Sequence, residues 1–325
     1  HKLFSHVRKN NLLHANIAVY GLDADLIMLS IFHLKCCRRI YVCREAPEFL
    51  KSSIPVDVKN GSNESYFVDI NCLGECILSE MGCEEGSDPS KSRLNDYVFL
   101  CFFLGNDFLP HFISLNIRTN GMDILIDAYN RVILMRGLWL LCSEEGVCWL
   151  NVKLLMCELC KCEGERMCVE SKSRSKSKSK SKSKSKSMSM SSNLLNVPLE
   201  SRGVEIYINP LSCGWESRYY KVLFARDAEL CEISVNYVEG LEWVYKYYTR
   251  DIVDSRWRYV YNYAPLLEDC KKWLPKENKA EFGICNENLE SLSENEALKY
   301  VMPPENVSGP FEWAFCRYFW ECHPL

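Results

Sequence analysis

The sequence predicts an α/β layer packed against a mainly helical layer, with helices dominating the protein as a whole. Short β-type apolar runs alternate with helix-type patterns in the first 140 residues, whereas the apolar periods after residue 193 are mostly helical. With 325 residues, 47% of them hydrophobic and 25% charged, the chain can bury a sizeable core. Both the pattern and the composition therefore predict a folded protein for most of the chain.

The α/β layer is expected to start with a strand at residues 16–22, NIAVYGL, which leads directly into a helix in DADLIMLSIF. A second strand is expected at residues 39–43, RIYVC. A very apolar helix is expected at residues 95–104, NDYVFLCFFL. It should end there, because GND and then LP follow. Apolar residues at helical spacing predict a further helix at residues 121–136.

The second half of the chain is expected to be helical. The patterns lie in YYKVLFARDAEL, in ISVNYVEGLEWVYKYYTRD and in the terminal FEWAFCRYFWEC, whose aromatic residues we interpret as core packing. The longest apolar stretches, such as VFLCFFL, fall well short of the roughly 20 residues needed to cross a bilayer. No membrane span is predicted.

A Lys/Ser tract at residues 171–192 has no apolar periodicity and is predicted to be a disordered insert. It could be an electrostatic tether for RNA, a linker tuned by phosphorylation, or a tolerated expansion of a surface loop. We therefore expect an α/β part at 1–140, a helical connection at 141–170, the insert, and a helical domain at 193–325. Removing the tract's eight cations from the formal charge of −4 leaves −12, so the folded part is acidic.

The cysteines indicate a reducing compartment. There are nineteen, an odd number, and they are scattered through apolar periods rather than arranged as a framework. Cys157 and Cys160 have zinc-like spacing, but no second pair follows at the distance of a zinc finger or ribbon. An intracellular protein is therefore expected.

Two aspartates follow the first predicted strand. Asp23 and Asp25 lie two residues apart, so in extended chain both carboxylates can face one point beyond the strand's carboxyl end, where open α/β sheets place ligands. Paired carboxylates repel each other unless a cation lies between them, and Mg²⁺ or Mn²⁺ prefers such oxygen ligands. The alternative is that one aspartate only caps the following helix.

A third aspartate lies in GNDFLPH, after the very apolar helix. Gly105 allows a left-handed turn and Pro110 prevents a return to helix, so Asp107 is expected on a rigid loop. Its carboxylate could bind a metal ion; the alternative is an Asx-turn. His111 is interpreted as a packing residue, because Mg²⁺ sites rarely use imidazole.

Together GLDADLIML and FLCFFLGNDFLPH resemble the 5′→3′ exoribonuclease family, whose nuclease core binds divalent metal through acids in these two places. The likeness extends to His1-Lys2, which resembles the end of a Gly-Glu-Gly-Glu-His-Lys motif, and to GLEWVYKYYTRDIVDSRWRYVYNYAP, which resembles the family's helical region. The resemblance implies a remnant of a PIN/FEN-like α/β nuclease core packed against a helical domain.

The resemblance also implies a chemistry. Asp23, Asp25 and Asp107 would bind Mg²⁺ or Mn²⁺, and the substrate would be RNA with a 5′-monophosphate, cut one nucleotide at a time to nucleoside 5′-monophosphates by metal-assisted hydrolysis. The chain would start just after two metal-binding glutamates of the family. We therefore expect a fragment that is inactive by itself.

Some residues depart from the family pattern. DSRWRY stands where Ser-Trp-Ser-Trp-Tyr-Tyr is common, which leaves Trp257 and Tyr259 as candidate stacking faces for RNA bases, with core packing as the alternative for Trp257. Asn262 replaces a usual His. No Cys-x-x-Cys zinc knuckle follows RIYVCRE, which favours the cytoplasmic over the nuclear branch.

Two other functions stay open at this point. The first is a non-catalytic RNA-binding or interaction module derived from a decayed or truncated paralogue. The second, ranked last, is a related metal nuclease that cuts DNA flaps, since such enzymes keep the acids but lack the GLEWVYKYY region. The sequence does not indicate an oligomeric state.

Overall fold

The structure is a computed structural model. It describes residues 2–10, 12–45, 65–83, 88–142, 146–167, 204, 207–224, 228–249 and 257–278. The Lys/Ser tract at 171–192 and the terminal aromatic stretch at 311–322 lie outside the described residues. The disorder of the tract and the packing of the terminal stretch therefore stay predictions.

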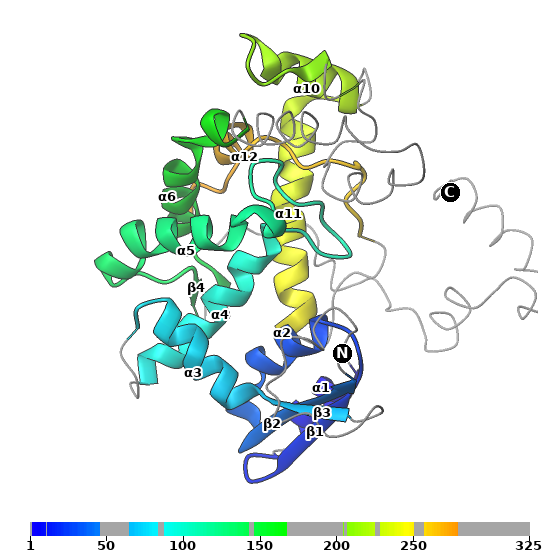
Figure 1. Cartoon of the computed structure of the whole chain (residues 1–325), viewed down its shortest axis with the longest axis vertical. Coiled ribbons are helices and arrows are strands. Elements are labelled where there is room, and N and C mark those ends of the chain that lie inside the picture. The colour runs from blue at the N-terminus through cyan, green and yellow to red at the C-terminus, as the bar shows by residue number, and fades with distance from the viewer. Residues whose placement is uncertain are drawn as a thin grey trace, which may run out of the picture.

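A small three-stranded sheet forms the lower part of the molecule (Figure 1). Its strands are β1 (Asn16–Tyr20), β2 (Arg39–Glu45) and β3 (Ser65–Asp69), in the order β1-β2-β3. β1 pairs parallel with β2, with Ala18 opposite Tyr41, and β3 pairs antiparallel with β2, with Val68 opposite Val42. The strands predicted at 16–22 and 39–43 are confirmed, whereas β3 was not predicted.

The helices of this part of the chain are α1 (Lys2–Lys9), α2 (Asp25–Phe32), α3 (Ile70–Glu80) and α4 (Asp88–Phe102). α3 begins directly after β3 because the Asp69 carboxylate accepts hydrogen bonds from the backbone N–H groups of Asn71 and Cys72, which caps the helix. α2 and α3 both pack against β2 and against α4. The helix expected at 95–104 therefore exists, but it starts seven residues earlier, at Asp88.

The regular elements in the rest of the described chain are helices and one short hairpin. Its elements are α5 (Gly121–Val132), β4 (Leu141–Cys142), β5 (Gly146–Val147), α6 (Trp149–Cys160), α10 (Trp215–Leu223), α11 (Leu230–Thr249), α12 (Leu267–Lys272) and the 3-10 turns η1 (Leu34–Cys36), η3 (Ile117–Thr119) and η4 (Leu134–Arg136). The helix predicted at 121–136 breaks after Val132 into a 3-10 turn. The helix predicted in 219–230 ends at Leu223, because Phe224 adopts an extended backbone.

The long helix α11 runs through the centre of the molecule and joins its lower and upper parts (Figure 1). It packs against α2 and α4 below and against α12 above. Its buried Tyr237, Trp243 and Tyr248 belong to the same hydrophobic core as Phe102 of α4 and Val42 of β2. The small sheet and the helical part thus share one core, and helices dominate the whole, as predicted.

Buried polar groups attach the hairpin to α4. The Asp96 carboxylate is fully buried and accepts hydrogen bonds from the Tyr129 hydroxyl at 2.6 Å and from the backbone N–H of Leu141 at 2.9 Å. Arg93 lies 3.7 Å from the same carboxylate and also donates to the Leu138 carbonyl. Cys142 and Cys148, on either side of the hairpin, lie next to each other, with their Cα atoms 6.4 Å apart.

The sequence predicts no membrane-spanning segment. Among the helices that the structure describes, none combines the length and the apolar character required to span a bilayer.

Candidate carboxylate site

Asp23 and Asp25 lie in the turn between β1 and α2. Asp25 is the first residue of α2, and its backbone N–H donates a hydrogen bond to Asp23 Oδ1 at 2.9 Å. The N-cap residue of α2 is Ala24, which makes no side-chain cap hydrogen bond, so the contact of Asp23 belongs to the turn before the helix. This contact occupies one of its two carboxylate oxygens, and its side chain remains exposed while Asp25 is half-buried.

Asp107 lies on the loop that follows α4. Gly105 has a left-handed backbone, φ 89°, and a Cβ there would lie 2.9 Å from the backbone nitrogen of His111, so the loop folds tightly back on itself. The side chain of Asn106 accepts hydrogen bonds from the backbone N–H groups of Phe108 and Leu109 at 2.9 and 3.0 Å. The Asx-turn is thus made by Asn106, and the alternative that assigned it to Asp107 is wrong.

Because Asn106 satisfies the loop's backbone, the Asp107 side chain is left exposed to solvent. The loop itself is held from the other side by α11, since the Tyr237 hydroxyl donates to the Pro110 carbonyl at 2.7 Å. Asp107 is therefore presented by a braced loop, as the sequence predicts.

Three carboxylates from these two segments act on one another. The pKa of Asp25 is raised, first by burial and then by the negative charges of Asp23 and Asp107, while a hydrogen bond with the Tyr248 hydroxyl lowers it. Two like charges disfavour the ionised form of Asp25, and a cation among the three would reverse that effect. The fold therefore brings Asp107 within electrostatic reach of Asp25, although the two lie far apart in the sequence.

Two tyrosines of α11 complete the surroundings. Tyr248 is buried, with its ring 5.3 Å from that of Phe102. The pKa of Tyr247 is raised by burial and by the charges of Asp25 and Asp107. Sequence reasoning placed both tyrosines in a helix but assigned them no part in the site, because nothing in the sequence shows that α11 passes the two aspartate loops.

The donor chemistry of this site fits a hard divalent cation, which prefers carboxylate oxygens. In the described part of the chain, however, no three His, Cys, Asp or Glu side chains converge closely enough to hold an ion by themselves. His111 Nε2 is buried and has no hydrogen-bond partner among the described residues, and burial lowers the pKa of the imidazole. The described structure therefore does not bring the three aspartates together as one ligand group, and a metal ion shared by all three stays a prediction.

The candidate stacking residues lie in packed surroundings. Trp257 stacks on Trp243 with ring centroids 5.3 Å apart, and Trp243 stacks on Tyr247 at 4.9 Å. A Cβ at Gly240 would lie 2.6 Å from Cη2 of Trp257, so the indole presses directly on the backbone of α11. Tyr259 donates its hydroxyl to the Tyr263 carbonyl at 2.7 Å. Base stacking by Trp257 or Tyr259 therefore stays a prediction beside the core packing that both residues perform.

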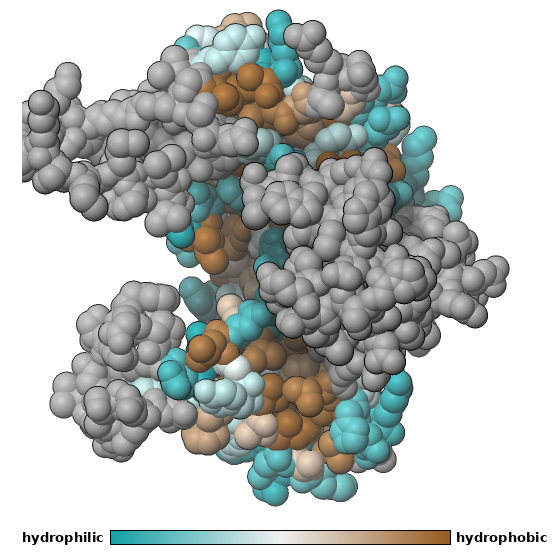
Figure 2. Space-filling model, turned by 90° about the vertical axis from the view of Figure 1, so that its right-hand side faces the viewer, coloured by the Kyte–Doolittle hydropathy of each residue, from teal (hydrophilic) through white to brown (hydrophobic). Residues whose placement is uncertain are grey.

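One face of the molecule is hollowed between its lower and upper parts (Figure 2). Brown, apolar residues gather along this recess and over the lower part, and teal, hydrophilic residues surround them. The recess separates the part that carries β1, β2 and β3 from the part that carries α10, as the position of these elements in Figure 1 indicates.

The chain matches a family model described as the Xrn1 helical domain, over residues 90–205 and 200–292. A protein of Gallus gallus named 5′-3′ exoribonuclease 2 is 25% identical over 370 residues, which covers 83% of this chain and 39% of that protein. The protein of the same name in Candida albicans is 31% identical over 190 residues, covering 51% of this chain and 19% of the relative. That of Saccharomyces cerevisiae is 32% identical over 171 residues, covering 45% and 16%.

The chain spans between 16% and 39% of the length of these three relatives. The family match includes α4, the Asp107 loop, α5, α6 and α11, whereas Asp23 and Asp25 lie outside it. The matched residues make up more than half of the chain, and the chain therefore belongs to the 5′→3′ exoribonuclease family that carries the Xrn1 helical domain.

Proposed function

We propose that this chain is part of a 5′→3′ exoribonuclease that degrades RNA by divalent-metal-dependent hydrolysis. The reaction removes nucleoside 5′-monophosphates one at a time from RNA that carries a 5′-monophosphate. Membership of the family and the names of the relatives support the enzyme class.

One observation carries the metal assignment. Asp25 lies within electrostatic reach of both Asp23 and Asp107, and both neighbours raise its pKa. A cation near these carboxylates would offset the repulsion between their charges. Mg²⁺ or Mn²⁺ is the proposed ion, and Asp23, Asp25 and Asp107 are its proposed ligands from this chain.

When bound, the ion would lower the pKa of an attacking water and stabilise the charge that develops on the leaving oxygen. The residues of this chain would position the site. Tyr248 hydrogen-bonds the Asp25 carboxylate and thereby favours its ionised form, which is the form that binds cations. Asn106 and Gly105 fix the loop so that the Asp107 carboxylate stays directed outward.

We also propose that these 325 residues need further carboxylates from elsewhere in the protein to hydrolyse RNA. The described residues supply no group of three metal-ligating side chains that converge closely. Cytoplasmic RNA decay, rather than nuclear, is the corresponding proposal for its location, and it rests on the lack of a zinc knuckle after RIYVCRE.

The test uses the full-length protein that contains this chain, a 5′-phosphorylated RNA and Mg²⁺. We expect Asp107→Asn and Asp25→Asn each to reduce the rate of nucleotide release by at least about a hundredfold, because charge stabilisation by a metal is worth several kcal/mol. Asp123→Asn is the matched control, since Asp123 is exposed on α5 outside the carboxylate site. Full activity of Asp107→Asn would exclude the assignment.

The alternative is a non-catalytic RNA-binding or interaction module. The incomplete convergence of the carboxylates among the described residues favours it. It predicts that the full-length protein binds RNA equally well with and without Mg²⁺ and releases no nucleotides, so the same assay separates the two functions.

A further inference from the structure

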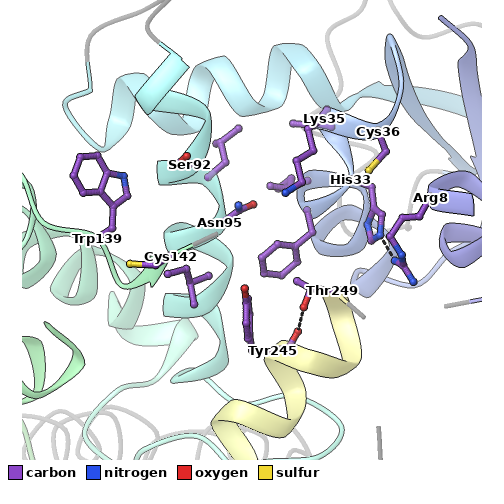
Figure 3. Close-up of a pocket in the computed structure, with 15 residues that line it drawn as sticks. Arg8, His33, Lys35, Cys36, Ser92, Asn95, Trp139, Cys142, Tyr245 and Thr249 are labelled. Carbon is purple, nitrogen blue, oxygen red and sulfur yellow. Dashed lines mark hydrogen bonds between the residues drawn. The ribbon is translucent and has the colours of Figure 1, made fainter. Parts of the chain in front are cut away.

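A cavity of about 500 Å³ lies between α2, α4 and α11, apart from the proposed metal ligands (Figure 3). Phe32, His33 and Lys35 come from α2 and η1, Asn95 comes from α4, and Tyr245 comes from α11. None of the three site aspartates lines it. The cavity opens beside the last residues of α2, whereas Asp25 is the first residue of that helix, about 10 Å away along its axis.

The charges around this cavity have one sign. Arg8 and Lys35 line it, and among the described residues that line it there is no Asp or Glu. Lys35 forms no ion pair within the described part of the chain, and Figure 3 shows its amine directed into the cavity, toward Asn95. Such a positive cavity stands out in a chain whose residues outside the Lys/Ser tract carry a formal charge of −12.

His33 lies at the cationic end of the cavity, and both of its ring nitrogens already form hydrogen bonds. His33 is buried, its Nδ1 pairs with the Leu29 carbonyl at 2.6 Å, and its Nε2 accepts from the Arg8 guanidinium. The carbonyl can only accept, so Nδ1 carries the proton and the ring is neutral. His33 therefore holds Arg8 in place and leaves Lys35 as the cation that faces the interior (Figure 3).

The opposite end of the cavity is aromatic and polar. Trp139 also lines the cavity, on the other side of α4 from Lys35 in Figure 3, and one face of its indole is covered by the Arg93 guanidinium, 4.2 Å from the ring. The rings of Phe32 and Tyr245 also line the cavity. Asn95 offers an amide donor and acceptor near the middle.

We propose that this cavity binds a nucleoside monophosphate, with the phosphate at Lys35 and the base beside Asn95 and Tyr245. A strongly hydrated point charge such as a lysine amine is a common partner for phosphate, while aromatic rings and an amide suit a flat heterocycle. A cavity of about 500 Å³ lies within the range of small-ligand sites. This site is separate from the carboxylates, so it stands whether or not the chain takes part in hydrolysis.

The test is a calorimetric titration of the full 325-residue chain with adenosine 5′-monophosphate, in EDTA so that no metal ion contributes. We expect Lys35→Gln to weaken binding at least about tenfold, because it removes a charge-assisted hydrogen bond. Asn95→Asp, which keeps the shape but adds a negative charge, should weaken it at least as much. Lys221→Gln is the matched control, since Lys221 is an exposed lysine on α10, and it should leave the affinity within about twofold.

Two further ligands identify what is recognised. Adenosine without phosphate should bind at least about tenfold more weakly than the monophosphate, and ribose 5-phosphate should also bind more weakly. Equal binding of adenosine, or equal effects of Lys35→Gln and Lys221→Gln, would overturn the proposal. So would tighter Lys35-dependent binding of a 5′-phosphorylated oligoribonucleotide, because the site would then hold an RNA end rather than a free nucleotide. Because Lys35 is exposed, Lys35→Gln keeps the test decisive even if Asn95→Asp fails to fold.

Discussion

His33 should make the protein sensitive to mild acid. The ring is 2% exposed, lies 4.6 Å from the ring of Phe4 on α1, and is held in its neutral form between the Leu29 carbonyl and the Arg8 guanidinium. Burial, and then the positive charges of Arg8 and Lys35, lower its pKa from 6.5 to about 4, while the hydrogen bond to Leu29 opposes the shift. Protonation of His33 removes the acceptor that Arg8 uses and places two positive charges side by side, which weakens the contact between α1 and His33.

The direction of the pH effect on stability follows from the difference between the pKa of His33 in the folded and in the unfolded chain. The unfolded chain binds a proton at His33 more readily than the folded chain does, so the folded state loses stability as pH falls. The contribution is fully present above pH 6.5 and disappears as pH approaches 4. A tenfold change in an equilibrium corresponds to about 1.4 kcal/mol, so the complete effect is about 3 kcal/mol, of which about 2 kcal/mol is lost by pH 5.

The assay is urea unfolding followed by tryptophan fluorescence at pH 7.5, 6.0 and 5.0. His33→Gln keeps an amide that can contact both Leu29 and Arg8 but cannot take up a proton, so the fall in unfolding free energy between pH 7.5 and 5.0 should be about 2 kcal/mol smaller than in the unmodified chain. In the difference between the two proteins, the contributions of the other titrating groups to the pH dependence cancel. These groups include His111, whose pKa is also lowered by burial.

His14→Gln is the control, because His14 is exposed, and it should leave the pH profile unchanged. A His33→Gln variant whose stability falls with pH as steeply as that of the unmodified chain would show that His33 is not held neutral by its surroundings. The contact between α1 and His33 described above would then be wrong.

Two packing predictions follow from α11 and α12. Gly240→Ala should lower the unfolding free energy by about 1 kcal/mol, because its Cβ would lie 2.6 Å from both Leu109 Cδ2 and Trp257 Cη2, and this overpacking outweighs the better helix propensity of alanine. The control is Gly164→Ala, whose Cβ meets no atom within 4 Å and which should not destabilise the chain. Equal thermal midpoints for the two variants would contradict this packing. Glu163→Ala should lower the unfolding free energy by about 2 kcal/mol, because buried Glu163 accepts hydrogen bonds from the N–H groups of Leu267 at 3.0 Å and Glu268 at 3.3 Å at the start of α12. The control is Glu165→Ala, at an exposed residue, which should change the free energy measured by urea unfolding by less than about 0.5 kcal/mol. An equally small loss for Glu163→Ala would show that Glu163 does not stabilise the start of α12.

Much of the α/β part could be predicted because its local signals agree with its tertiary structure. β1 and β2 are short apolar runs, and the aspartates after β1 stand where the strand gives way to α2. The loop after α4 was also predictable, since Gly105 and Pro110 restrict its backbone. The choice between Asn106 and Asp107 for the Asx-turn was not, because either side chain can make that hydrogen bond and only the folded loop decides.

The remainder depends on contacts between distant segments. β3 and α3 lie in SYFVDINCLGECILSE, which lacks a clear period, and β3 exists because it pairs with β2. The cap that Asp69 places on α3 was the one local signal available there. The position of Tyr248 beside Asp25 depends on how α11 packs on α2, and no pattern within either helix specifies it.

The central claim is that Asp23, Asp25 and Asp107 share one divalent cation. Electron paramagnetic resonance of free Mn²⁺, titrated with the full-length protein, measures this directly because bound Mn²⁺ loses its six-line signal. We expect tight binding that weakens at least about tenfold in Asp107→Asn and in Asp25→Asn, and not in Asp123→Asn. Unchanged Mn²⁺ affinity in Asp107→Asn, with Asp25→Asn impaired, would mean that the loop after α4 contributes no ligand, and the site as described would be contradicted.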